Sequence, residues 1–78
     1  MPLTTNLYVA DKNSRFQVTS VPNIRLLENI GLRSGTQVTV QNRYALGGPV
    51  LLRVEDAYSV ALGKDIAIQI GVRKVNLS

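Results

Sequence analysis

The side chains that could do chemistry are few in this chain. It has no His and no Cys, so the usual histidine base, the cysteine nucleophile and the commonest zinc ligands are all absent. Only two of the five acids, Glu55 and Asp56, are neighbours. They fall in a predicted turn, where an acidic pair is normally solvated or holds an ion weakly. We therefore predict no catalytic residues, no resident metal site, no cofactor and no enzyme activity.

A glycine-rich segment, Leu46-Gly47-Gly48-Pro49, is the second candidate for chemistry. Two glycines can expose backbone N–H groups to a phosphate. No Lys-Ser/Thr pair follows them, however, and Pro49 removes one donor, so the segment predicts a tight turn. Leu46 then lies at a loop tip. It is either an apolar knob that docks on a protein partner or a side chain folded back over the end of the fold.

Length and charge bound the remaining possibilities. Seventy-eight residues predict a single domain, 1–78, with a core near the lower size limit for independent stability. The net charge of +4 is compatible with an acidic partner, but the basic residues are dispersed and the aromatic residues scattered. We therefore expect no nucleic-acid partner. No apolar run is long enough to enter a membrane, and the absence of cysteine and of a signal segment favours the cytoplasm.

The apolar pattern predicts a mainly β protein. Five short strands are expected, joined by tight turns, over residues 15–21, 36–44, 49–54, 58–62 and 70–75. Closing such a sheet removes its exposed edges, so we predict a small five-stranded SH3-like barrel. Residues 1–9 are expected to be extended.

Two short helical segments are expected between the strands. The first follows the first predicted strand, with Asn23 as N-cap and an end at Ile30. Gly31 stands where a left-handed residue ends a helix, and Leu32 can fold back onto its apolar side. The second is a single turn over residues 65–68, before the last strand. Gly71, within that strand, is a candidate bulge.

Taken together, the segments from Ile24 to Val75 resemble the FeoA family of bacterial ferrous iron uptake. The resemblance rests on the order and spacing of several motifs, none specific alone: Leu26-Leu27, Ile30-Gly31-Leu32-Arg33-Ser34-Gly35, Leu46-Gly47-Gly48-Pro49-Val50, Ala61-Leu62, and Ala67-Ile68-Gln69-Ile70-Gly71-Val72. Two positions depart from the family pattern. Ala45 stands where proline is common, and Gly63 where a polar or basic residue is usual.

The resemblance implies both a fold and a function. It implies an SH3-like barrel acting as a cytoplasmic accessory protein that docks on the cytosolic GTPase-bearing region of the FeoB transporter. The expected contact loop is Tyr44, Leu46, Gly47 and Gly48, with Arg43 and Arg53 as supporting charges. The alternatives are a small-barrel nucleic-acid-binding module and a metal-dependent regulatory module that binds a transition metal ion. A weak homo-oligomer is compatible with each of these functions.

Overall fold

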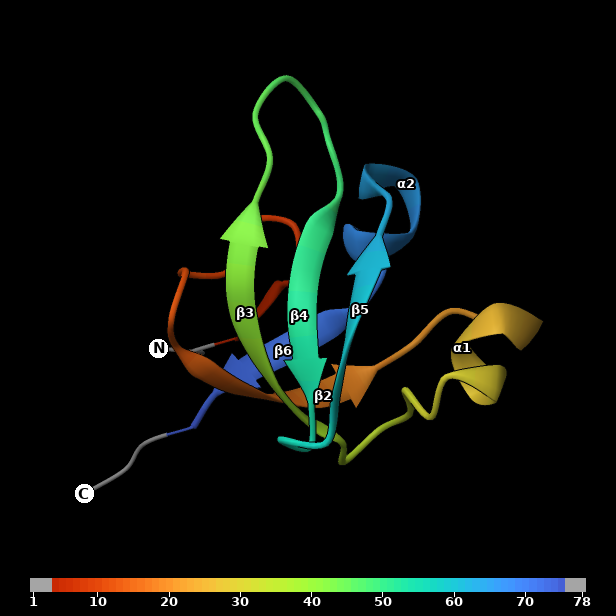
Figure 1. Ribbon diagram of the computed structural model, residues 1–78. Helices are drawn as coiled ribbons and strands as arrows, with labels where there is room; N and C mark the ends of the chain where they lie inside the picture. Colours follow the sequence, from red (N-terminus) through yellow and green to blue (C-terminus); the bar gives the residue numbers. More distant parts are fainter. Residues whose placement is uncertain (1–3, 76–78) are drawn as a thin grey trace.

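The computed structural model describes residues 4–75 (Figure 1). Most of the regular secondary structure in the described chain is β-strand, as predicted. Two short helices interrupt the strands, and the elements follow one another as β1 (Thr4–Asn6), β2 (Arg15–Ser20), α1 (Arg25–Asn29), β3 (Gln37–Arg43), β4 (Val50–Val54), β5 (Tyr58–Leu62), α2 (Lys64–Ala67) and β6 (Gly71–Lys74).

The strands form one antiparallel sheet in the order β1-β6-β2-β3-β4-β5. Two expectations are corrected here: the sheet has six strands rather than five, and it is open rather than a closed barrel. The two outer strands, β1 and β5, would have to pair for the sheet to close, but among the described residues β1 pairs only with β6 and β5 only with β4.

The strand that was not predicted, β1, consists of Thr4–Asn6, two threonines and an asparagine. Its sequence carries no apolar alternation, which is why the pattern of side chains does not indicate a strand. Pairing with β6, which aligns Thr5 with Val72, makes it one. The first three residues of the expected extended segment lie outside the described residues.

Fifteen buried apolar residues of the described chain form one core, to which the sheet, both helices and the connecting segments contribute. Alternation along the strands places them: in β4 every second residue from Val50 to Val54 is buried, as expected of a strand with one face in the core. Most members are aliphatic: Leu7, Ala10, Phe16, Val18, Leu27, Leu32, Val38, Val40, Val50, Leu52, Val54, Leu62, Ala67, Ile70 and Val72.

Helix α1 ends as the sequence predicts but begins differently. Gly31 has φ +83 and its N–H donates to Glu28, while the Leu32 N–H donates to Leu27 at 2.9 Å, the paired bonds of a Schellman motif. At the other end the N-cap is Ile24, with no side-chain cap bond, so the expected cap by Asn23 is not formed. Because β1 precedes β2, α1 follows the second strand.

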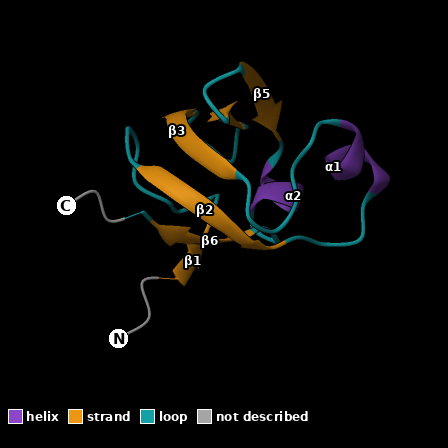
Figure 2. Cartoon of the chain, turned by 90° about the horizontal axis from the view of Figure 1, so that it is seen from below, coloured by secondary structure: helices purple, strands orange, loops and turns teal. Residues whose placement is uncertain are grey.

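Figures 1 and 2 both place α1 at the margin of the molecule, whereas α2 lies close to the strands. Helix α2 covers one residue fewer at its C-terminal end than the predicted turn and begins one residue earlier. The predicted bulge is displaced as well. The register shift lies in β2 between Val18 and Ser20, and Gly71 is the residue that faces it. A Cβ at Gly71 would meet the Ser20 Oγ at 2.6 Å.

Candidate functional site

The β3–β4 loop, residues 44–49, extends beyond the ends of the neighbouring strands, at the top of Figure 1. Its base is set by the pairing of Arg43 with Val50, and the Tyr44 N–H closes the loop by donating to the Pro49 carbonyl at 3.1 Å. A register shift between Val40 and Asn42 bends β3 just before the loop. The loop is therefore aimed by the sheet itself.

The tip of the loop is a tight turn from Ala45 to Gly48. The Gly48 N–H donates to the Ala45 carbonyl at 3.2 Å. The two central residues both have positive φ, +62 at Leu46 and +76 at Gly47, which is the pattern of a type I′ turn. Such a turn favours Asn-Gly or Gly-Gly at its centre, because other side chains meet the backbone when φ is positive.

Leu46 breaks that preference without any contact that compensates for it. Its relative exposure is 104%, the highest among the large apolar residues of the described chain. A leucine in the left-handed region costs about 1–2 kcal/mol, and this one buries nothing in return. The alternative in which Leu46 folds back over the end of the fold does not occur.

Gly48 and Tyr44 give the loop its shape. A Cβ at Gly48 would lie 2.9 Å from the Tyr44 Cβ and 3.2 Å from the Ala45 carbonyl oxygen, so only glycine fits there. The Tyr44 side chain is half exposed, next to the tip. The structure therefore brings four of the predicted contact residues into one loop: Tyr44, Leu46, Gly47 and Gly48.

The two arginines predicted to support this loop lie elsewhere. The Arg43 guanidinium turns inward, where its Nη2 donates to the Ala10 carbonyl and its Nε is buried without a partner among the described residues. Arg53 lies toward the other end of β4, where its Nη2 donates to the Asp56 carbonyl at 3.1 Å. The structure thus does not bring either cationic group to the loop tip.

Another cation, not selected from the sequence, lies beside the loop. The Cδ of Lys64 is 3.9 Å from the position that a Cβ on Gly47 would take. The Lys64 Nζ lies 5.2 Å from the centroid of the Tyr8 ring, which is within cation–π range. Nothing in the sequence signals this group, since Tyr8, Gly47 and Lys64 are far apart in the chain.

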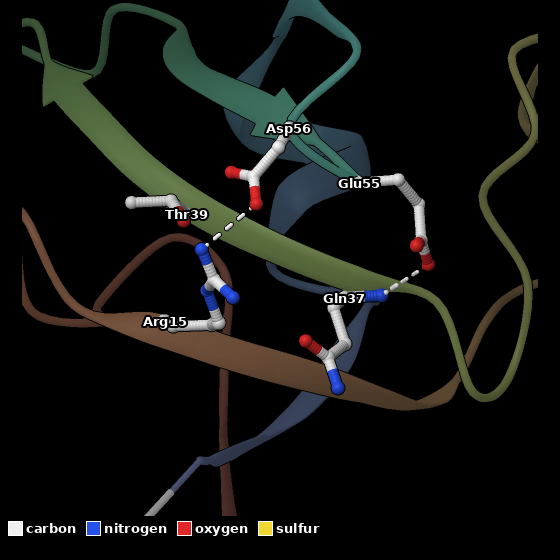
Figure 3. A pocket seen from close by; sticks show the side chains of 5 residues that line it. All are labelled: Arg15, Gln37, Thr39, Glu55 and Asp56. Atoms are coloured by element: carbon white, nitrogen blue, oxygen red, sulfur yellow. Dashed lines mark hydrogen bonds and ion pairs between the residues drawn. The ribbon is translucent and has the colours of Figure 1, made fainter. Parts of the chain in front are cut away.

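The β4–β5 turn, at the opposite end of β4, is the second conspicuous feature (Figure 3). Glu55 and Asp56 have φ +52 and +59, and the Ala57 N–H donates to the Val54 carbonyl at 2.8 Å. Arg15, Gln37 and Thr39 complete a small polar pocket around the two acids.

Both carboxylates of this turn are engaged within the fold. Glu55 Oε2 accepts the Gln37 N–H at 2.9 Å, and Asp56 Oδ2 pairs with Arg15 Nη2 at 2.9 Å. Residues 4–75 hold no cluster of three or more His, Cys, Asp or Glu side chains that could bind a metal ion. The acidic pair therefore has a structural role in the turn.

Among residues 4–75, no helix has the length and apolar character needed to cross a membrane. The FeoA domain family matches residues 5–74, and no curated protein sequence matches the chain.

The solved structures similar to this one include proteins of two kinds. An iron uptake regulatory protein (FeoA) is 26% identical with a TM-score of 0.81, and the match covers 92% of this chain and 97% of that one. A FeoA-like protein from Clostridium acetobutylicum is 24% identical with a TM-score of 0.81, over 100% and 94% of the two chains. A manganese-dependent transcriptional repressor is 20% identical with a TM-score of 0.84, over 96% of this chain but 44% of the repressor.

Proposed function

The chain belongs to the FeoA family, and from this premise we propose that it is a non-enzymatic, cytoplasmic accessory protein of ferrous iron uptake. FeoA domains are small accessory domains. The proposed action is docking on the cytosolic GTPase-bearing region of a FeoB-type transporter, with the β3–β4 loop as the contact.

One observation carries the proposal: Leu46 stands fully exposed at the tip of a glycine-shaped loop, on a backbone with φ +62. Local strain of this kind persists only where the surrounding structure maintains it, and it is concentrated at functional sites. Burying a leucine side chain in an apolar pocket of a partner contributes about 1.5–3 kcal/mol.

The shape of the loop also lowers the cost of binding. The bonds from Tyr44 to Pro49 and from Gly48 to Ala45 hold the tip in one conformation before a partner arrives. A preorganised loop loses less conformational freedom when it binds than a flexible one does. Lys64, beside Gly47, supplies the nearby positive charge that would favour an acidic rim on the partner.

The test is a binding titration with the purified cytosolic region of the transporter. We expect Leu46→Asp to weaken binding about 10- to 100-fold, the loss that corresponds to an unburied leucine. Val9→Asp is the matched control, because Val9 is also an exposed aliphatic residue, at 57%, but lies outside the loop. Equal affinity of the wild type and Leu46→Asp would refute the loop assignment.

The alternative functions have no comparable support. Likeness to the manganese-dependent repressor at 20% identity concerns the fold alone. A nucleic-acid-binding module would need stacking aromatics, yet Phe16 is buried and the Tyr58 hydroxyl donates to the Ile30 carbonyl. Absence of DNA or RNA binding at about 50 mM salt would eliminate this reading. A thermal melt unchanged by ferrous iron or manganese would eliminate the metal-dependent one.

A further inference from the structure

Strand β5 is one edge of the sheet, and its outer side is open. It pairs only with β4, from Val54 opposite Tyr58 to Val50 opposite Leu62. Within residues 4–75, the backbone of β5 makes no hydrogen bond to any segment other than β4. In Figure 1 this free side faces away from β4, between α2 and α1.

This edge lacks the features that normally prevent strands from pairing between molecules. Its sequence, Tyr58-Ser59-Val60-Ala61-Leu62, has no charged residue and no proline, and its pairing with β4 has no register shift. Natural edge strands are usually short, charged, bulged or covered. The opposite edge, β1, is only three residues long. The open edge of β5 therefore offers a regular row of backbone groups to another strand.

The side chains of β5 suit a neighbour of the same kind. Ser59 and Ala61 are small and exposed on one face, whereas Val60 and Leu62 lie on the core side. A strand added here would need small or polar residues on the first face and aliphatic or aromatic residues on the second. β5 itself has that alternation and the same length.

We propose that a second copy of this chain pairs with β5, antiparallel and about a twofold axis at Val60. This register places Ser59 opposite Ala61 of the second copy and Tyr58 opposite its Leu62. This register also places Asp56 opposite Lys64 of the second copy and Glu55 opposite its Asp65. Asp56 is already paired with Arg15 in its own copy and Glu55 accepts the Gln37 N–H, so the charges at the two ends balance and do not oppose the pairing.

The dimer formed in this way is weak. Five residue pairs bury much less than the roughly 1,200–2,000 Å² of a stable interface. Association therefore depends on concentration and becomes appreciable where several copies are held close together. The proposal does not depend on the docking function, because it can be tested with the protein alone.

The test is sedimentation equilibrium of the full chain up to about 1 mM, the weak end of specific affinities. Two double variants are compared with the wild type. In Ser59→Lys/Ala61→Lys the proposed register places like charges directly opposite, whereas in Ser59→Lys/Ala61→Glu it places opposite charges there. Both positions are exposed and both variants lose the bond from Ser59 Oγ to Gln41 Oε1, so the folded monomers are matched.

We expect the dissociation constants of the two variants to differ about tenfold or more, because cross-strand charge pairs act twice in a twofold dimer. The Lys/Lys variant is the weaker, and NMR signals of residues 58–62 shift on dilution of the wild type. A wild type that stays monomeric up to about 1 mM would overturn the proposal. So would a dimer whose dissociation constant is the same in both variants.

Discussion

The β3–β4 loop and the β4–β5 turn lie at opposite ends of the same strand, and each passes through two consecutive residues with positive φ. In both, the residue after this pair donates its N–H back across the turn. Both turns at the ends of β4 therefore contain the same strained backbone feature, two consecutive residues with positive φ. They differ in the side-chain contacts that stabilise it.

The β4–β5 turn is held by the rest of the fold. Glu55 and Gln37 exchange two hydrogen bonds, one from each backbone N–H, at 2.8 and 2.9 Å. Arg15 pairs with the Asp56 carboxylate and Arg53 donates to the Asp56 carbonyl. The strain of two positive φ values is here offset by contacts that stabilise the monomer.

The β3–β4 loop has no such compensation at its tip. Leu46 is a poor residue for a left-handed conformation, and its side chain is fully exposed. Folding of this chain does not explain the choice of leucine, whereas burial in a partner would. The comparison thus separates a turn whose strain serves the fold from one whose strain we attribute to binding.

The largest effect on stability is expected at Gly48, because the corresponding residue of the β4–β5 turn, Ala57, carries a Cβ whereas Gly48 has no room for one. A methyl group there would press on the Tyr44 Cβ at 2.9 Å and on two carbonyl oxygens. We expect Gly48→Ala to lower the free energy of unfolding by about 2 kcal/mol, as overpacking does. Urea denaturation measures it. Gly63→Ala is the control, because Gly63 has φ −64 and nothing within 4 Å of a built Cβ. A loss of the same size in both variants would show that the loop is not closely packed.

Leu46→Asn and Glu55→Asn replace the first positive-φ residue of the two turns at the ends of β4. Leu46→Asn creates the Asn-Gly pair that type I′ turns prefer and removes no buried contact, so we expect about 1 kcal/mol of added stability. Glu55→Asn also suits positive φ but loses the bond to Gln37, worth about 1 kcal/mol, so its stability should stay the same or fall. Thermal melts of the two variants measure the difference.

The same two variants can also be compared by their affinity for the transporter's cytosolic region. Leu46→Asn should bind about tenfold or more weakly although it is more stable, since the apolar side chain is lost. Glu55→Asn should bind like the wild type. If Leu46→Asn destabilised the protein, Leu46 would have a folding role, and the contrast between the two turns would disappear.

Much of this contrast is visible in the sequence, because glycine and proline report directly on the backbone. Gly31 marked the end of α1, and Leu46-Gly47-Gly48-Pro49 marked a loop with leucine at its tip. The positions of these turns follow from a few neighbouring residues, and such local patterns can be read without the fold. The positive φ values of Leu46, Glu55 and Asp56 do not follow in this way, because none of these residues is glycine.

The rest depends on contacts between distant residues. The inward turn of Arg43 requires the Ala10 carbonyl, 33 residues away, and strand β1 exists only because β6 offers a free side. The failure of Asn23 as a cap is local instead, since the helix begins one residue later than expected, after Ile24. Sequence patterns carry no information about such distant partners. The sequence therefore predicts Arg43 and Arg53 beside the loop, whereas the fold places their guanidinium groups elsewhere.

The smallest expected effect concerns the ion pair that distinguishes the β4–β5 turn. Asp56→Asn keeps a residue that tolerates positive φ and removes only the charge facing Arg15. Because the two side chains are 37% and 62% exposed, the loss should be about 0.5 kcal/mol at low salt. It should vanish near 1 M salt, where charges are screened beyond about 3 Å. Denaturation at the two salt concentrations measures both. A loss that persists at high salt would mean that the geometry of Asp56, rather than its charge, holds this turn, and the same geometric argument would then have to be applied to Leu46.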